Sequence, residues 1–265
     1  GSEGTLGVIT KIVMRLIPHP KHDLLMLVPF NSAERACEAV SAIFREGIVP
    51  SGMEFMERDA IQYTMDFIGE EPVPLKADEQ AHLLIEVDGN DLDALMSDCE
   101  KIAGVVEKFE CGEILFAEDQ AKKDQLWKLR RRVGEAVKAQ SVYKEEDTVV
   151  PRYKLPELLI AVKEVGKLYG FRSVCYGHAG DGNLHVNILR DEMCEEDWNK
   201  TVKVGVRSLF ERVKAMGGTI SGEHGIGLVQ RDYMDIMFSE SHLELMRSIK
   251  RVFDPKGILN PGKIF

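Results

Sequence analysis

The stretch RSVCYGHAGDGNLHVNIL, residues 172–189, has the pattern of two strands joined by a glycine-rich loop. The strand-like parts are residues 172–176 and 185–189. The loop between them contains three glycines, one Asp and one Asn, residue types that tolerate the positive φ angles of tight turns. Strands on both sides of such a loop predict a β-hairpin, the connection that joins neighbouring antiparallel strands.

Outward from this hairpin, strand-like and helix-like stretches alternate at short spacing. Residues 24–30 have the pattern of a buried strand, and Ser32 is a suitable N-cap for a helix over residues 33–45. Further strands are predicted at residues 8–16, 54–55, 82–87, 105–110, 148–151 and 219–222. Further helices are predicted at residues 91–103, 119–140, 155–169 and 195–216. This alternation is typical of an α+β fold built from ferredoxin-like antiparallel sheet units, with helices packed on one side.

The composition is that of an ordinary globular protein. The chain has 265 residues, of which 44% are hydrophobic and 29% charged, and a net charge of −10. No stripe of Lys and Arg with interleaved aromatics is present, which argues against nucleic acid and anionic membranes as partners. No apolar run approaches the roughly 18–20 residues of a membrane span. Five scattered cysteines without a CxxC pair indicate free thiols, and so predict a cytoplasmic location, with peripheral membrane association through a partner left open.

Two histidines flank the loop of the predicted hairpin. The hairpin would bring His178 and His185 together at its mouth, where two imidazoles can form part of a divalent-metal site. Asn187 lies two residues beyond His185 and so on the same face of the strand. Two alternatives remain open here: two unrelated histidines beside a turn, or a phosphate-binding loop, although no helix and no GxGxxG spacing follow.

A second cluster, SGEHGIG, occupies residues 221–227. Glu223 is a natural third ligand for a metal site with two histidines, and such a site leaves positions open for substrate. The neighbouring His224 could then act as a general base near neutral pH. The alternative is a glycine-rich turn whose Glu and His side chains only face solvent.

The predicted helix at residues 119–140 carries Arg130 at the edge of its apolar stripe. The stripe itself consists of Leu126, Leu129, Val133 and Val137. An arginine that emerges from an apolar face can pair with a carboxylate through two hydrogen bonds. The alternative is an arginine whose charged head simply reaches solvent.

These motifs together resemble a known family. The opening GSEGTLGVIT, residues 1–10, looks like the last glycine-rich turn and strand of the FAD domain in flavoproteins of the vanillyl-alcohol-oxidase type. Residues 177–187, residues 221–227 and the tail DPKGILNPGK at residues 254–263 resemble the C-terminal FAD-linked oxidase domain. The four motifs occur in the same order as in glycolate oxidase flavoprotein subunits and in D-lactate and D-2-hydroxyglutarate dehydrogenases.

The resemblance implies roles for individual residues. His178, His185 and Glu223 would hold a divalent metal, zinc or manganese. His224 would be the base, Arg130 would bind the substrate carboxylate, and Asn187 would contact the substrate or the flavin edge. The residues that would line FAD are Gly1, Ser2, Gly4, Thr5 and Gly7, with Asn260 approaching from the tail.

The resemblance also implies a domain arrangement and a reaction. Residues 1–20 would end an otherwise missing FAD-binding domain, residues 21–238 would bind the substrate, and residues 239–265 would return to the FAD domain. The implied reaction is oxidation of a small D-2-hydroxy acid to the 2-oxo acid, with hydride transfer to FAD. Electrons would pass to an iron–sulfur partner or another acceptor, and this chain alone would be inactive.

Two departures from the family concern the substrate. Relatives that oxidise dicarboxylates carry a Lys where we align Glu145, and a Thr where this chain has Gly134. Both differences favour a monocarboxylate such as glycolate or D-lactate. Two other functions stay open: a metal-dependent hydrolase that uses the same His/His/Glu site, and a non-catalytic α+β binding module. Neither gives a role to the turn at residues 1–7 or to the tail at residues 260–262.

Overall fold

The computed structural model describes residues 1–265, and seven strands in it form one antiparallel sheet in the order β4-β1-β3-β2-β6-β7-β5. The strands are β1 (His22–Phe30), β2 (Gly52–Glu57), β3 (Ala81–Gly89), β4 (Leu115–Phe116), β5 (Tyr143–Val149), β6 (Arg172–Gly177) and β7 (Asn183–Leu189). The helices are α1 (Ala33–Arg45), α2 (Arg58–Ile68), α3 (Leu92–Val106), α4 (Gln120–Lys138), α5 (Leu155–Tyr169), α6 (Glu195–Ala215), α7 (Met234–Met237) and α8 (Glu240–Phe253). The predicted α+β class and the predicted hairpin, which is β6–β7, are confirmed.

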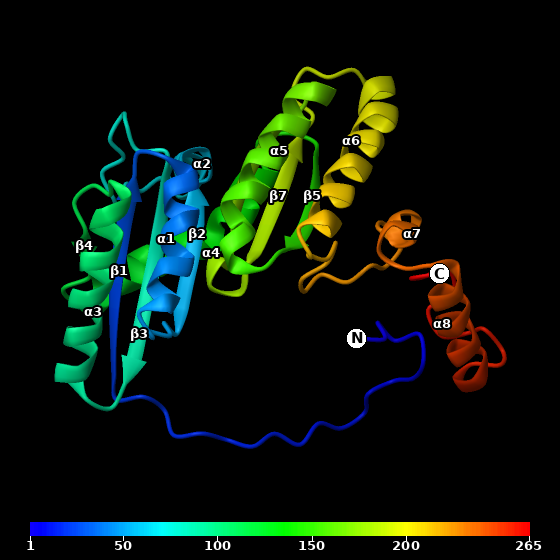
Figure 1. Ribbon diagram of the computed structural model, residues 1–265, viewed down its shortest axis with the longest axis horizontal. Coiled ribbons are helices and arrows are strands. Elements are labelled where there is room, and N and C mark those ends of the chain that lie inside the picture. Colours follow the sequence, from blue (N-terminus) through cyan, green and yellow to red (C-terminus); the bar gives the residue numbers. More distant parts are fainter.

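The sheet consists of two ferredoxin-like halves joined edge to edge (Figure 1). The first half has the strand order β4-β1-β3-β2, which is the ferredoxin-like order, and includes α1 and α3. The second half contains β6, β7 and β5 with α5 and α6. The halves meet where β2 pairs with β6, through Phe55 opposite Gly177 and Met56 opposite Tyr176.

Each face of the sheet has its own hydrophobic core. The larger core joins one face to α1, α3, α5 and α6. Helices do not pack on one side alone, contrary to the prediction, because the opposite face of the sheet is also apolar and needs a cover of its own. On the opposite face, α2 and α4 bury a smaller core that includes the predicted stripe of α4. Arg130 is buried beside this stripe whereas Arg131 is exposed, as the helical spacing predicts.

Some predicted elements were wrong. The strand expected at residues 105–110 is instead the end of α3 and a 3-10 turn at Glu107–Phe109, because Val105 and Val106 continue the buried face of the helix. Residues 219–222 make only isolated bridges to β5, which begins at Tyr143 rather than at residue 148. Helix α2 was not predicted.

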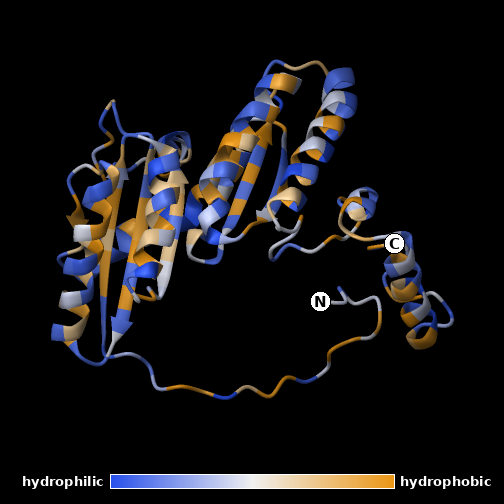
Figure 2. Cartoon of the chain, in the orientation of Figure 1, coloured by the Kyte–Doolittle hydropathy of each residue, from blue (hydrophilic) through white to orange (hydrophobic).

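The apolar run at residues 8–16 forms no strand and lies in the extended N-terminal segment, which Figure 2 shows with mostly apolar colouring. Its side chains are exposed, Val13 at 87%. None of the helices combines the length and the apolar character that crossing a membrane requires.

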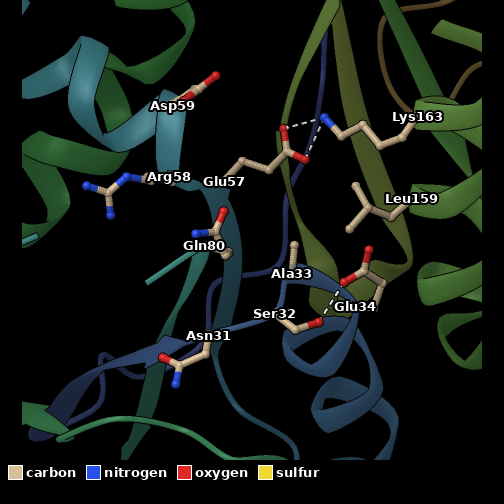
Figure 3. A pocket seen from close by; sticks show the side chains of 10 residues that line it. All are labelled: Asn31, Ser32, Ala33, Glu34, Glu57, Arg58, Asp59, Gln80, Leu159 and Lys163. Atoms are coloured by element: carbon tan, nitrogen blue, oxygen red, sulfur yellow. Dashed lines mark hydrogen bonds and ion pairs between the residues drawn. The ribbon is translucent and has the colours of Figure 1, made fainter. Parts of the chain in front are cut away.

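A buried carboxylate connects the two halves of the sheet on the face of the larger core. Glu57, the last residue of β2, contacts Lys163 of α5 with both oxygens, at 2.7 and 2.8 Å (Figure 3). One of these oxygens also accepts a hydrogen bond from the backbone N–H of Cys175 in β6, at 2.7 Å. Burial raises the pKa of Glu57, although Lys163 and this backbone N–H oppose the shift. Glu57 therefore fastens β2 to both β6 and α5.

Replacing Glu57 with Gln should lower the free energy of unfolding by about 2 kcal/mol, because a charged group then loses hydrogen bonds across the junction. Urea unfolding followed by circular dichroism would measure the change. Glu100→Gln, on the exposed side of α3, is the control and should alter stability by less than about 0.5 kcal/mol. Equal stability of the Glu57 and Glu100 variants would contradict this assignment.

Candidate active site

The hairpin β6–β7 places the candidate ligands on the face of the sheet that α4 covers. In β7, Leu184, Val186 and Ile188 enter the larger core, so His185 and Asn187 point to the other face. The loop turns back through Gly182, which has φ of 77°. A Cβ at this position would lie 2.1 Å from the carbonyl oxygen of Val150, so the turn requires glycine.

The three predicted metal ligands converge. Nε2 of His178 and Nε2 of His185 each lie 3.6 Å from Oε1 of Glu223. One ligand atom from each residue lies within 4.8 Å of the other two. Two imidazole nitrogens and one carboxylate oxygen facing a common point are a donor set that fits a zinc or manganese ion.

The surroundings of the two histidines differ. Burial lowers the pKa of His185 to about 4, so its imidazole is neutral and can bind a metal. His178 is more exposed, and its Nδ1 lies 2.9 Å from Oε1 of Glu54. This hydrogen bond is the main cause of a raised pKa at His178, although burial opposes it. Sequence reasoning missed Glu54.

Arg130 also contacts Glu54. Its Nε and Nη2 lie 2.9 and 2.8 Å from Oε2 of the carboxylate. The guanidinium is buried, and its carbon lies 5.4 Å from the centre of the Tyr176 ring. Only Nε makes a hydrogen bond within the chain, so both terminal nitrogens are available to a ligand. Arg130 therefore lies one side chain away from His178 in space, because both contact the carboxylate of Glu54.

A second residue that sequence reasoning missed, Asp147 of β5, holds the loop that carries Glu223 and His224. Its Oδ2 accepts hydrogen bonds from the backbone N–H groups of Gly222, Glu223 and His224, at 2.8, 2.7 and 2.8 Å. Asn183 donates to Oδ1 at 2.6 Å. Burial alone would raise the pKa of Asp147, but these hydrogen bonds outweigh it and the pKa is lowered. Asp is depleted in strands, but nothing else in the sequence distinguishes Asp147 from other polar residues.

His224 and Asn187 lie where a substrate could meet them. The rings of His224 and His185 stack with centroids 5.0 Å apart, and 42% of the His224 side chain is exposed. Asn187 is fully buried, yet neither atom of its amide group has a hydrogen-bond partner. Buried amides are normally satisfied, so the amide of Asn187 is a hydrogen-bonding group that a ligand could use.

The N-terminal turn packs directly against the loop of His224. The carboxylate of Glu3 accepts hydrogen bonds from the backbone N–H groups of Ile226 and Gly227, both at 2.7 Å. The side chain of Asn260 donates to the carbonyl oxygen of Glu3 at 2.6 Å, which brings the tail to the same place. Figure 1 shows the N-terminus beside α8 and the C-terminus.

A cavity of about 660 Å³ lies between this turn, the His224 loop and α8. Of the residues predicted to line FAD, Gly1, Ser2 and Thr5 line this cavity. Gly4 lies against Asn260, whereas Gly7 is outside the lining. Most of the predicted cofactor-binding residues are thus gathered beside the candidate base.

The fold and the site together define an α+β domain with a His/His/Glu cluster next to a glycine-rich N-terminal turn. A family model described as "FAD linked oxidases, C-terminal domain" matches residues 19–264. The chain belongs to this family.

Three relatives are identical to the chain at about a third of the aligned positions. It is 36% identical to a D-lactate dehydrogenase from Anaerostipes hadrus, over 100% of this chain and 56% of the relative. It is also 36% identical to the glycolate oxidase subunit GlcD of Escherichia coli K12, over 99% of this chain and 52% of the relative. A D-2-hydroxyglutarate dehydrogenase from Stutzerimonas stutzeri is 30% identical, over 100% of this chain and 57% of the relative. The chain thus spans about half the length of these relatives.

Two solved structures share the fold at low sequence identity. p-Cresol methylhydroxylase with bound substrate superposes with a TM-score of 0.69 at 14% identity, over 94% of this chain and 53% of the other. A 4-ethylphenol oxidase from Gulosibacter chungangensis gives 0.65 at 14% identity, over 95% and 55%. At this identity the likeness concerns the fold alone.

Proposed function

We propose that the chain is the substrate-binding part of an FAD-dependent oxidoreductase that converts a small D-2-hydroxy monocarboxylate into the 2-oxo acid. The observation that carries this proposal is the convergence of His178, His185 and Glu223 beside His224. In this proposal residues 1–20 belong to the FAD-binding domain, and residues 21–238 form the substrate-binding domain. Residues 239–265 return to the FAD-binding domain. The contacts between the N-terminal turn and the tail support that division.

The chain's own residues would divide the chemistry among them. His178, His185 and Glu223 would hold the metal ion, and the substrate would lie between this cluster and Arg130. Arg130 would pair with the substrate carboxylate through its terminal nitrogens, which make no hydrogen bond within the chain.

His224 would take the proton of the substrate hydroxyl, since its ring lies against His185 and is open to the site. Asn187 would hydrogen-bond the substrate or the flavin edge with its unpaired amide. When bound, a divalent zinc or manganese ion would supply Lewis acidity toward the hydroxyl, and FAD would supply the hydride acceptor. An iron–sulfur protein or another acceptor would then receive the electrons.

The charge of the site supports a substrate with a single carboxylate. A carboxylate oxygen of Glu145 lies within 4.8 Å of nitrogen atoms of His185 and His224. Glu145 also contacts Lys138 at 2.7 Å and the hydroxyl of Tyr176 at 3.1 Å. A carboxylate in this place would repel a second carboxylate on the substrate. Glycolate or D-lactate therefore fits the site better than a dicarboxylate.

The first test is elemental metal analysis of the complete flavoprotein that contains this chain. About one divalent metal per chain is expected in the wild type, and it should be lost in His178→Ala because the site then has two ligands. His19→Ala removes an exposed histidine outside the site and should keep the metal. The metal site would be refuted if the wild-type protein contains no metal, oxidises D-lactate or glycolate, and keeps this activity in the presence of a chelator. Hydrolytic activity without flavin would favour the metal-dependent hydrolase instead.

A further inference from the structure

We propose that Glu54 is a positioning residue that sets the orientation of a metal ligand and of the substrate-binding arginine at the same time. This inference rests on the proposed function of the site. Glu54 lies in the middle of β2, its side chain is 10% exposed, and it points to the face that α4 covers. One carboxylate oxygen contacts His178 and the other contacts Arg130, so a single side chain links both halves of the site.

The contact with His178 determines which ring nitrogen is free. Glu54 forms an ion pair with the guanidinium of Arg130, at 2.8 and 2.9 Å, so it is a carboxylate and can only accept hydrogen bonds. Nδ1 of His178, at 2.9 Å, must therefore carry the hydrogen. Nε2 then has the lone pair, and it is Nε2 that faces Glu223 and the metal position.

The contact with Arg130 determines how the guanidinium lies. Nε donates a hydrogen bond to one oxygen of Glu54, and Nη2 lies 2.8 Å from the same oxygen as an ion pair, which holds the guanidinium beside β2 while its terminal nitrogens make no hydrogen bond within the chain. The face of the Tyr176 ring lies 5.4 Å from the guanidinium carbon and limits its rotation further. Without Glu54 the arginine would keep its charge but lose its defined direction.

The neighbouring Glu57 offers a matched control for Glu54. Both are buried carboxylates of β2, and both bond across the junction between β2 and the second half of the sheet. Three residues apart on a strand, they point to opposite faces, and Glu57 meets Lys163 rather than the site (Figure 3). If Glu54 has a purely structural role, substitutions of Glu54 and Glu57 should have similar effects on stability, zinc affinity and KM. If Glu54 is a positioning residue, only its substitution should change zinc affinity and KM.

The experiment compares Glu54→Gln, Glu54→Asp and Glu57→Gln in the complete, flavin-loaded protein. Zinc affinity is measured by competition with a chelator, and KM and kcat are measured with D-lactate. Glu54→Gln should bind zinc about 10- to 100-fold more weakly, because the amide cannot accept hydrogen bonds from both partners. Its KM should rise as well, because Arg130 loses its orientation. Glu54→Asp should recover part of both losses, and Glu57→Gln should lower stability with zinc affinity and KM unchanged.

The outcomes separate this inference from the proposed function. A wild-type protein that binds no zinc contradicts the proposed metal site itself. Zinc binding in the wild type together with unchanged zinc affinity and KM in Glu54→Gln would overturn the positioning role alone. Equal losses of zinc affinity in Glu54→Gln and Glu57→Gln, in step with stability, would also overturn it. If Glu54→Gln does not fold, Glu54→Asp decides: wild-type affinity and KM in that variant would reject the positioning role, and an intermediate loss of both would support it.

Discussion

Replacing His224 with Ala is expected to lower the turnover of D-lactate or glycolate by about 100-fold or more, the loss typical of a missing general base. His224 lies on the open side of the site, with its ring stacked on that of His185 at 5.0 Å. The removed side chain makes no side-chain hydrogen bond within the chain, so the fold should survive the change. Its backbone N–H stays in place to hydrogen-bond Asp147.

The measurement is kcat of the complete flavoprotein over a range of pH, with flavin content read from its absorbance. His224→Ala should keep its flavin and its metal, so that the loss reports the proton transfer. His242→Ala removes a histidine from the surface of α8 and should turn over like the wild type. Near-normal turnover in His224→Ala would remove this residue from the role of base.

Replacing Asp147 with Asn is expected to lower turnover by about 100-fold and to weaken metal binding, because Glu223 and His224 both depend on this carboxylate for their position. Three backbone N–H groups share one oxygen of Asp147, and Asn183 donates to the other. An amide at residue 147 would present its own N–H₂ to one of these donors. The free energy of unfolding should fall by about 2–3 kcal/mol, since hydrogen bonds to a buried charge are lost.

The pH dependence of stability provides a second measurement on Asp147. The pKa of Asp147 is lowered in the folded protein. The ionised carboxylate therefore contributes fully to the free energy of unfolding above the ordinary carboxyl pKa of about 4, and this contribution is lost as the pH falls toward the lowered pKa. Urea unfolding between pH 7 and pH 3 should show this loss in the wild type and a smaller one in Asp147→Asn. Asp181→Asn, in the exposed part of the hairpin loop, is the control. Equal acid sensitivity of the wild type and Asp147→Asn would refute the anchoring role.

Local patterns in the sequence were enough to predict the elements that surround the site. The bounds of α1 and α5 agree residue for residue with the prediction, because a capping Ser32 and the glycine after Tyr169 mark their ends. The period of α4 separates the buried Arg130 from the exposed Arg131. Helical periodicity, capping residues and turn residues act between residues that are close in the chain. The sequence alone is therefore enough to recognise them.

The sequence also named the three residues that converge on a common point, since glycine-rich loops set His178, His185 and Glu223 apart from ordinary surface groups. What it could not reveal is the set of carboxylates that hold them. Glu54 meets His178 across 124 residues of chain, and Asp147 meets the backbone of His224 across 77. Such a carboxylate looks in the sequence like any polar residue of a strand. Glu54 is buried against its partner only when β2 pairs with β6, and Asp147 only when β5 pairs with β7. These pairings are determined by the packing of the whole sheet and not by local preference.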